Sequence, residues 1–397
     1  MGMVKSIQNR DGALLRESFA FGQRIRREVH RHPELSGRET RTSSLLQQEL
    51  RELGYSVAVL DGSPSFLAFD PTCTHFALGL RAELDALPIQ ENPNEKEVVS
   101  EHAGIMHACG HDMHMGIACA FAYYLAKADR GTINSSGVLF IFESSEESLP
   151  GGAQAILESE VFKARRPSTM FAFHCDPAWP VGSLASKPGE YMASGDELHF
   201  TVRGQGGHGA LPQEHDDPLL AGAHLVIALQ SMMTRTVPAD IPAVLSVGRF
   251  EALGATNVVP DVATLQGTFR THNEAWRAVV KKNIRAVAQG IGNAFHVDID
   301  TRIVEGYPTL INSPELYERA SEVSEGLTPP VRFERVGLRM TTDDFAYFAQ
   351  AIPSLYVRLG VGTDGGKLHT ATFCPDEEAI GVALEWLLAY YRSLAKG

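Results

Sequence analysis

Ten consecutive residues, "MHACGHDMHM" from Met106 to Met115, contain three histidines, one cysteine and one aspartate. Thiolate and imidazole groups are the ligands that zinc and its neighbouring transition metals prefer. An isolated cysteine is usually a buried, inert thiol, but Cys109 lies between His107 and His111. That position favours its interpretation as a ligand. The segment therefore predicts one part of a metal site, whose other ligands must come from elsewhere in the chain.

Further candidate ligands come at or just after four short apolar runs that are typical of buried strands. The runs cover residues 75–80, 137–142, 169–174 and 354–360. Because ligands in open α/β sheets bind beyond the carboxyl ends of the strands, we expect side chains at these positions to meet at one edge. In chain order they are Glu83 and Asp85, the adjacent pair Glu146 and Glu147, His174 at the end of its run, and His369.

Each of these residues alone has a structural interpretation, since a glutamate pair is usually solvated and a histidine at a strand end is usually hydrogen-bonded. Their common location favours a site, and the adjacent charges of Glu146 and Glu147 repel unless one binds a cation. Five ligands are more than one tetrahedral ion needs, which predicts two divalent ions (Zn, Mn, Co or Ni) sharing a bridging ligand. The five are Cys109, His111, Glu147, His174 and His369.

Glu146 then remains as a general base. Bound metal lowers the pKa of water from 15.7 to about 7, and a positioned carboxylate can take the proton. The predicted chemistry is hydrolysis of an amide. A metal-storage protein without turnover is the alternative of another class, and it has no use for an unligated base beside its ligands.

The elements that must position these residues alternate between helices and strands. Helical periodicity covers residues 13–32, 39–54, 116–128, 151–162 and 377–395. Alternation with the four apolar runs predicts an α/β domain with a mixed, mostly parallel sheet and flanking helices. We assign to it residues 1–185 and 303–397, the second part including helices at 314–325 and 343–351.

The middle of the chain, residues 186–302, has a different pattern. Four alternating strand patterns at 196–204, 243–250, 263–272 and 296–304 surround two helical stretches near 217–235 and 273–293. This order predicts an inserted α+β domain in which two helices cover one face of an antiparallel four-stranded sheet.

Composition excludes several classes of partner. The formal net charge of −13 makes nucleic acid or an anionic membrane an unfavourable partner. No apolar run approaches the roughly 20 residues that cross a bilayer. The first residues, "MGMVKSIQNRDG", lack an apolar signal core, so we expect a cytoplasmic protein. Five scattered cysteines argue against a disulfide framework.

Nine collinear motifs make the chain resemble a known family, the co-catalytic metallopeptidases and amidohydrolases that include aminoacylases, hippurate hydrolase and the plant auxin–amino acid conjugate hydrolases. The motifs include "RREVHRHPELSGRE" (26–39), "LRAELDALPIQE" (80–91), "MHACGHD" (106–112), "GGHGALP" (206–212), "TNVVPDVATLQGTFRT" (256–271), "DDFAYF" (343–348) and "LHTATF" (368–373). The resemblance implies a zinc-peptidase-like catalytic domain with an inserted dimerisation domain. It also implies two metal ions on the five ligands named above, Glu146 as base, and Asp85 as the carboxylate that orients a ligand histidine.

The resemblance assigns three residues of the inserted domain to the substrate. His208 matches a histidine that reaches the reacting carbonyl across a dimer and steadies its oxyanion. Asn257 and Arg270 match residues near the carboxylate of the substrate. The implied assembly is a homodimer, or a tetramer built from dimers. The implied reaction is cleavage of an N-acyl amino acid. A dipeptidase, a carboxypeptidase or an aromatic-amine aminohydrolase on the same scaffold are the alternatives.

The sequence also departs from the family pattern. Glu83 stands where aspartate is commoner, "FESSEE" with Glu143 replaces the usual "FQPAEE", and Gln213 follows Pro212 where histidine is frequent. None of these changes removes a ligand. They leave the identity of the substrate open, together with the roles of His107, His114 and Glu143.

Overall fold

The computed structural model describes residues 10–93, 97–128 and 137–394 as two compact units. The first unit comprises Met1–Gly189, Ile311–Gly337 and Tyr347–Gly397, and the second comprises Glu190–Leu310 and Leu338–Ala346. The second unit thus ends later than the expected range 186–302. A boundary at residue 302 would cut strand β13 (Asp298–Glu305). The segment at 338–346 joins this unit through backbone hydrogen bonds of Arg339 with Tyr191 and Ala193.

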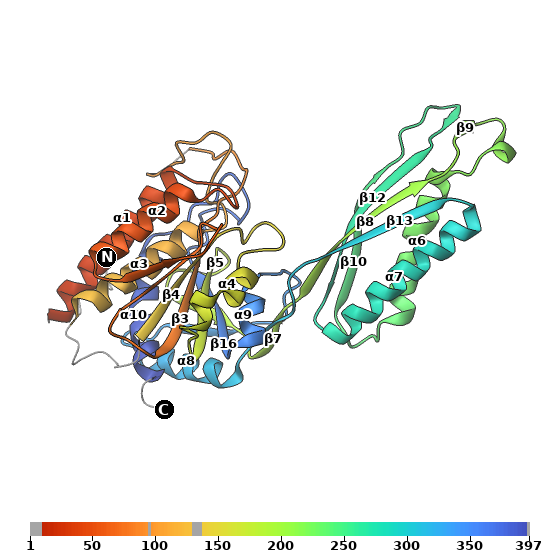
Figure 1. The fold of residues 1–397 in the computed structure, drawn as a ribbon. Helices are drawn as coiled ribbons and strands as arrows, with labels where there is room; N and C mark the ends of the chain where they lie inside the picture. Colours follow the sequence, from red (N-terminus) through yellow and green to blue (C-terminus); the bar gives the residue numbers. More distant parts are fainter. Residues whose placement is uncertain (1–9, 94–96, 129–136, 395–397) are drawn as a thin grey trace. The chain divides into compact units, whose positions relative to one another are not determined.

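The first unit is built on an eight-stranded mixed sheet, which confirms the predicted fold class (Figure 1). Its four central strands are mutually parallel, and each is a run of buried, mostly apolar residues because helices cover both faces. Antiparallel pairings occur toward the two sides of the sheet. The strand order is β1 (Ser56–Val59), β2 (Phe66–Phe69), β4 (Gly137–Glu143), β3 (Phe76–Glu83), β5 (Thr169–Asp176), β16 (Ser354–Gly360), β6 (Ser183–Ser186) and β15 (Arg332–Arg335).

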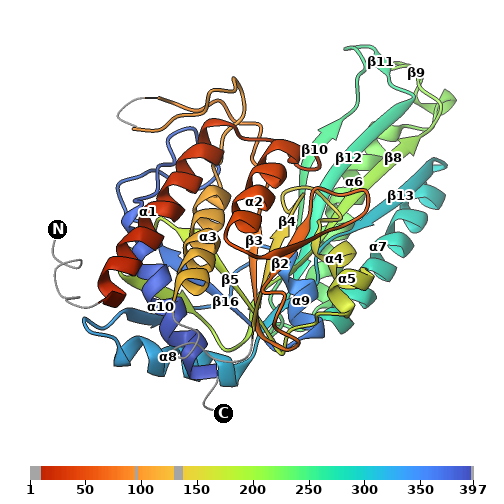
Figure 2. The ribbon, with the colours of Figure 1, turned by 60° about the vertical axis from the view of Figure 1, so that its left-hand side comes forward.

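Three helices pack together over one face of this sheet: α1 (Arg10–Arg31), α3 (His111–Lys127) and α10 (Glu378–Leu394) (Figure 2). Helix α3 is buried along most of its length, which explains why its sequence is apolar on all sides. Gly22 and Gly116 let α1 and α3 approach closely, since a Cβ on Gly22 would lie 2.5 Å from the carbonyl oxygen of Gly116. The other helices of this unit are α2 (Thr40–Glu52), α4 (Ala153–Glu158), α5 (Glu160–Lys163) and α8 (Pro314–Gly326). Helix α9 (Phe345–Ala351) spans the last boundary between the units.

The second unit has the expected antiparallel four-stranded sheet with two helices. The strand order is β10 (Ala243–Glu251), β12 (Val262–Thr271), β8 (Ser194–Arg203) and β13. Helices α6 (Pro218–Thr236) and α7 (Glu274–Phe295) pack on this sheet around a separate apolar core. Asp217 and Asn273 begin these helices by accepting hydrogen bonds from their first backbone N–H groups. Short strands β9 (Gly207–His208) and β11 (Val258–Val259) form a separate ribbon, and η2 (Pro212–Glu214) follows β9. Strands β7 (Gly189–Met192) and β14 (Leu310–Asn312) lie where the chain passes between the units.

Two helices differ from the sequence prediction. Helix α3 begins at His111 rather than at residue 116, so the histidine-rich segment continues directly into a helix. The expected helix at 151–162 is divided at Ser159, whose side chain accepts from Phe162 N and so begins α5. Among the described residues no helix is both long and apolar enough to span a bilayer. Residues 1–9, which carry most of the segment used to exclude a signal peptide, lie outside the described residues.

Candidate metal centre

Five segments of the first unit deliver the five predicted ligands. Cys109 lies just before α3, and His111 is the first residue of that helix. Glu147 lies in the loop after β4, and His174 belongs to the last part of β5. His369 follows β16 in a left-handed backbone conformation with φ 59°, and its N–H donates to Ala108 O at 2.9 Å. The structure brings all five together.

The donor atoms are close enough to share metal ions. Cys109 Sγ lies 3.5 Å from His174 Nε2 and 3.3 Å from His369 Nε2. Glu147 Oε1 lies 3.3 Å from His369 Nε2 and 3.9 Å from His111 Nε2. Atoms that bind one zinc at about 2.0–2.3 Å are roughly 3.3–3.8 Å apart in a tetrahedral shell. The spacing of the side chains therefore fits metal coordination, and Cys109 Sγ lies near both His174 Nε2 and His369 Nε2.

Two of these donor atoms have no hydrogen-bond partner in the described part of the chain. His111 Nε2 and Glu147 Oε1 are buried and make no hydrogen bond there. A buried polar atom without a partner is costly, and a cation between the two would satisfy both. The geometry and the chemistry of the donors thus fit divalent metal.

Asp85 holds one ligand histidine in the tautomer that metal binding requires. His111 Nδ1 lies 2.9 Å from the backbone oxygen of Asp85 and 3.2 Å from its Oδ1. A proton on Nδ1, donated to the backbone oxygen and stabilised by the nearby Oδ1 charge, leaves the lone pair of Nε2 for a metal. The other carboxylate oxygen, Oδ2, accepts from Ser36 Oγ at 2.7 Å and from Glu147 N at 2.9 Å. Asp85 therefore fixes two candidate ligands at once.

The side chains of the site carry an excess of negative charge. Burial alone would lower the pKa of His111, but the charges of Glu83 and Asp85 outweigh it and raise this pKa to about 10. Burial and the charges of Glu147 and Glu146 raise the pKa of the Cys109 thiol. Both groups thus hold protons that a divalent cation would displace, as expected for a site that binds metal with proton release.

His174 can also present its Nε2 to a metal. Nδ1 lies 2.7 Å from Cys175 O, an acceptor, and 2.8 Å from Arg358 Nη1, a donor. The tautomer in which Nδ1 donates its proton to Cys175 O is the one that directs the lone pair of Nε2 toward Cys109. Burial, followed by the nearby Arg358 charge, lowers the pKa of His174, which keeps the ring neutral as a ligand must be.

Glu146 occupies the position expected for a base beside the ligands. Its side chain is buried, and its Oε2 lies 3.8 Å from His111 Nε2. The preceding residue, Ser145, has φ 68°, a left-handed conformation that costs a residue with a side chain about 1–3 kcal/mol. This turn places two consecutive glutamates at one centre, where one can bind metal and the other can accept a proton.

The three residues with open roles lie beneath or beside the ligands. His114 Nδ1 donates to Glu83 Oε2 at 2.8 Å, and its Nε2 accepts from Cys175 N at 3.0 Å. Both nitrogens are therefore used, so His114 does not serve as a ligand, although it lies near Glu83 and His111. Glu143 accepts from the buried Arg81 at 2.8 Å. Burial lowers the pKa of His107 to about 3, so this ring is neutral.

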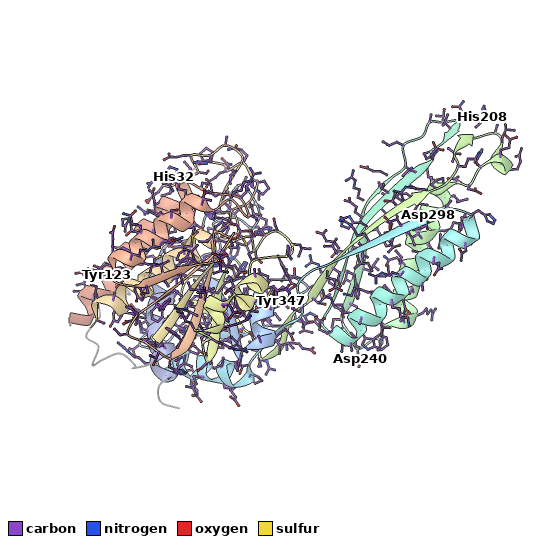
Figure 3. All side chains as sticks on the ribbon, viewed as in Figure 1. His32, Tyr123, His208, Asp240, Asp298 and Tyr347 are labelled. Atoms are coloured by element: carbon purple, nitrogen blue, oxygen red, sulfur yellow. The ribbon has the colours of Figure 1, made fainter. Side chains whose placement is uncertain are left out.

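The three candidate substrate residues lie in the second unit. His208 is exposed in β9, pairs with Val258, and lies beside Asn257, whose carbonyl accepts from Gly209 N at 2.8 Å. Figure 3 shows His208 and Asp240 at opposite ends of this unit. Arg270 lies near the end of β12, is half-buried, and donates to Met340 O at 2.7 Å. Within this unit the structure thus brings His208 and Asn257 together and places Arg270 in another strand.

Sequence reasoning missed several residues that support the centre. Ser36 and Glu39 both lie in the motif "HPELSGRE", whose side chains reach Asp85 and Ser145 N. Arg358 lies in the fourth apolar run, where a buried charge within a strand was the available signal. The motif at 26–39 contributed to the family resemblance, but its turn precedes a helix and follows no strand, so nothing in the pattern assigned a role to Ser36 or Glu39.

Comparisons with known proteins agree with this geometry. Residues 79–393 match the model of the peptidase family M20/M25/M40. The chain is 35% identical over 370 residues to the N-acetyldiaminopimelate deacetylase of Shouchella clausii strain KSM-K16, covering 92% of this chain and 96% of that protein.

Two solved structures share the fold over nearly their whole length. A protein of methicillin resistant Staphylococcus aureus has a TM-score of 0.86 and 27% identity, covering 96% of this chain and 97% of that one. A Bacillus subtilis peptidase described as dinuclear metal binding has a TM-score of 0.79 and 28% identity, covering 96% and 99%. With the metal-ligand geometry and the match over most of its length, the chain belongs to the peptidase family M20/M25/M40.

Proposed function

We propose that this metal-dependent amidohydrolase holds two divalent ions and cleaves the amide bond of N-acyl amino acids. The observation that supports this most directly is the convergence of Cys109, His111, Glu147, His174 and His369, with Glu146 adjacent. Cys109 Sγ lies near both His174 Nε2 and His369 Nε2, so it would help to hold the ions together with these histidines. Zinc, manganese, cobalt and nickel all suit this donor set.

Metal ions bound there would lower the pKa of water and polarise the substrate carbonyl. Glu146 accepts a proton from the attacking water and then gives it to the departing nitrogen. The carbonyl carbon gains a bond to the water oxygen and loses its bond to nitrogen, so the products are a carboxylic acid and an amine. Asp85 keeps His111 in its ligand tautomer throughout, and Arg358 remains beside His174.

The acyl group and the amino acid define two candidate substrates. Hippurate-type compounds follow from the motifs of the sequence. N-acetyldiaminopimelate is the second candidate, supported by a relative that is 35% identical and named as its deacetylase. In both cases we propose that the guanidinium of Arg270 binds the carboxylate of the amino acid part, together with the amide of Asn257 from the partner chain, because Asn257 lies beside His208 and apart from Arg270. A guanidinium suits a carboxylate through paired, charge-assisted hydrogen bonds.

We further propose that the working unit is a homodimer, in which His208 of one chain stabilises the oxyanion formed in the other. The second unit offers a suitable surface, because β10 is an edge strand and edge strands accept further pairing. Neighbouring apolar side chains are exposed as well: Leu219 (45%), Leu220 (46%) and Ile227 (63%) on α6, and Val244 (41%) on β10.

A substitution of the base tests the reaction. Glu146→Gln should bind two ions per chain, measured by elemental analysis, and should lose activity by about 10²–10⁴-fold. Glu158→Gln, at an exposed position on α4, is the matched control and should keep full activity. Wild-type turnover in Glu146→Gln would contradict the proposed mechanism.

A substrate panel identifies the acyl group and the amino acid. It comprises hippurate, N-acetyl and indole-acetyl amino acids, N-acetyldiaminopimelate and dipeptides, each assayed with zinc-, manganese- and cobalt-loaded enzyme. Preference for dipeptides would favour a peptidase on the same scaffold. Release of ammonia from an aromatic amine would favour an aminohydrolase.

A further inference from the structure

The loop that carries Glu146 and Glu147 is tied to three distant side chains through its backbone. Ser144 N donates to Ser65 Oγ at 3.0 Å, Ser145 N to Glu39 Oε1 at 2.8 Å, and Glu147 N to Asp85 Oδ2 at 2.9 Å. The second of these hydrogen bonds, to Glu39, is made by Ser145, whose backbone conformation is the most restricted of the three. Ser145 also directly precedes the two glutamates, so a change in its backbone conformation would displace both of their side chains.

The backbone of Ser145 is left-handed, with φ 68°. Across residues 10–93, 97–128 and 137–394, only Ser145, His296 and His369 among non-glycine residues have positive φ. His296 ends helix α7, where such a conformation is common. The other two lie at the metal centre. An unfavourable conformation persists only where surrounding contacts hold it, so Ser145 needs a contact that does so.

Glu39 supplies that contact. Glu39 is fully buried, with 0% of its surface exposed, and it forms no ion pair with a lysine or arginine in the described part of the chain. Burying a carboxylate without a cation is unfavourable, and burial raises the pKa of Glu39 to about 7. Such a residue requires a function that compensates for its burial.

Capping of helix α2 is the obvious structural function, and the hydrogen bonds exclude it. Glu39 stands at the N-cap position of α2, but its side chain makes no capping hydrogen bond. The first N–H groups of this helix are met by Glu34, which accepts from Arg41 N at 3.1 Å and from Thr42 N at 2.8 Å. The carboxylate of Glu39 is directed to Ser145 instead.

We propose that Glu39 is a positioning residue for the reaction: its carboxylate holds Ser145 in the left-handed conformation that presents Glu146 and Glu147 side by side. This inference rests on the proposed function only in assigning Glu146 as base and Glu147 as ligand. Glu39 acts through Ser145 and does not itself contact the reacting atoms.

Three variants test the proposal, with hippurate and N-acetyldiaminopimelate hydrolysis and zinc affinity as readouts. Glu39→Ala should lower kcat and zinc affinity by about 10–100-fold, as removal of a group behind a ligand does. Glu39→Gln should retain most of both, because its amide oxygen still accepts from Ser145 N. Adding Ser145→Gly to Glu39→Ala should recover at least a third of the lost activity on a logarithmic scale, because glycine adopts positive φ without steric cost.

If Glu39 only stabilised the fold, the double variant would not regain activity. Glycine at position 145 would then further lower the melting temperature and recover no activity. Either that result or wild-type kcat and zinc affinity in Glu39→Ala would overturn the proposal. If Glu39→Ala does not fold, the proposal is tested by comparing the activities of Ser145→Gly and Ser145→Val, each made in the wild-type background. The valine variant should lose activity while the glycine variant keeps it, and equal activity would overturn the proposal.

The test separates this inference from the proposed function. An active Glu146→Gln variant would refute the assignment of the base, whatever Glu39 does. An inactive Glu146→Gln variant with an unchanged Glu39→Ala variant would refute only the positioning role. Zinc affinity is measured without turnover, so it reports on Glu147 even when no substrate is hydrolysed.

Discussion

Replacing Asp85 by asparagine should weaken metal binding without removing a ligand. The carboxylate of Asp85 faces three N–H or O–H groups: His111 Nδ1 lies 3.2 Å from Oδ1, and both Ser36 Oγ and Glu147 N donate to Oδ2. Asparagine has one acceptor oxygen and one NH₂ group in the same volume. Whichever way its amide turns, an NH₂ group faces the N–H of either His111 or Glu147, so one ligand loses its support.

The expected magnitude follows from the hydrogen bond that is lost. A hydrogen bond to a charged group contributes about 1.5–3 kcal/mol, and each 1.36 kcal/mol corresponds to a factor of ten. The affinity for metal should therefore fall by roughly 10- to 150-fold. The backbone oxygen of Asp85 still accepts from His111 Nδ1, so the ring keeps its tautomer and the loss does not reach that of a deleted ligand.

A competition titration against a chromophoric zinc chelator measures this loss on folded protein. Ser36→Ala is the matched control, since it removes a hydrogen bond to the same Oδ2 that involves neither ligand. That hydrogen bond to a charged group also contributes about 1.5–3 kcal/mol, but both ligands keep their contacts with Asp85. Asp85→Asn with zinc affinity within threefold of the wild type would refute the idea that Asp85 orients the ligands. Equal losses in the two variants would show that the pocket is merely destabilised.

Two further predictions concern Glu39 and the surface of α6. Burial raises the pKa of Glu39 from 4.5 to about 7, so the folded chain binds this proton more tightly than the unfolded chain and loses stability as the pH rises through that interval. The melting temperature of Glu39→Gln, which cannot ionise, should therefore rise relative to the wild type between pH 5 and pH 8; a constant difference would contradict the raised pKa. Ile227→Glu places a charge on an exposed apolar surface (63% exposed) and should convert the proposed dimer to monomers with lower activity, measured by light scattering. Lys282→Glu on α7 is a control that also introduces a glutamate at an exposed helix position, and it should leave the molar mass of the assembly unchanged.

The sequence predicted the central strands well because they are buried on both faces. A strand covered by helices is a continuous apolar run, and β16 falls on the expected residues 354–360. Strands β1, β2, β6 and β15 were not predicted. Each has only four residues, too few to show a period, and pairing with neighbouring strands is what defines them.

The ligands were predictable for a related reason. Cysteine, histidine and paired glutamates are recognisable by type, and the ends of parallel strands place them at one edge of the sheet. The start of α3 at His111 was not predicted, because residues 107–112 (HACGHD) show no helical periodicity and the apolar pattern is recognisable only from the stretch that follows. The helix extends to His111 because residues on every side of its first turn are buried, which a sequence pattern cannot indicate.

Glu34 and Glu39 show where a sequence alone is insufficient. Glu39 stands directly before a helix, the position at which a polar side chain normally satisfies the first N–H groups. Glu34 does so instead, from five residues earlier, because the chain turns back at Gly37, whose φ is 74°. The two carboxylates are of the same type and lie in the same motif, so only the direction of each side chain distinguishes helix capping from support of the metal centre. A buried acid at a helix start whose N–H groups another residue already satisfies is therefore a candidate for function, and this criterion can be applied only to a structure.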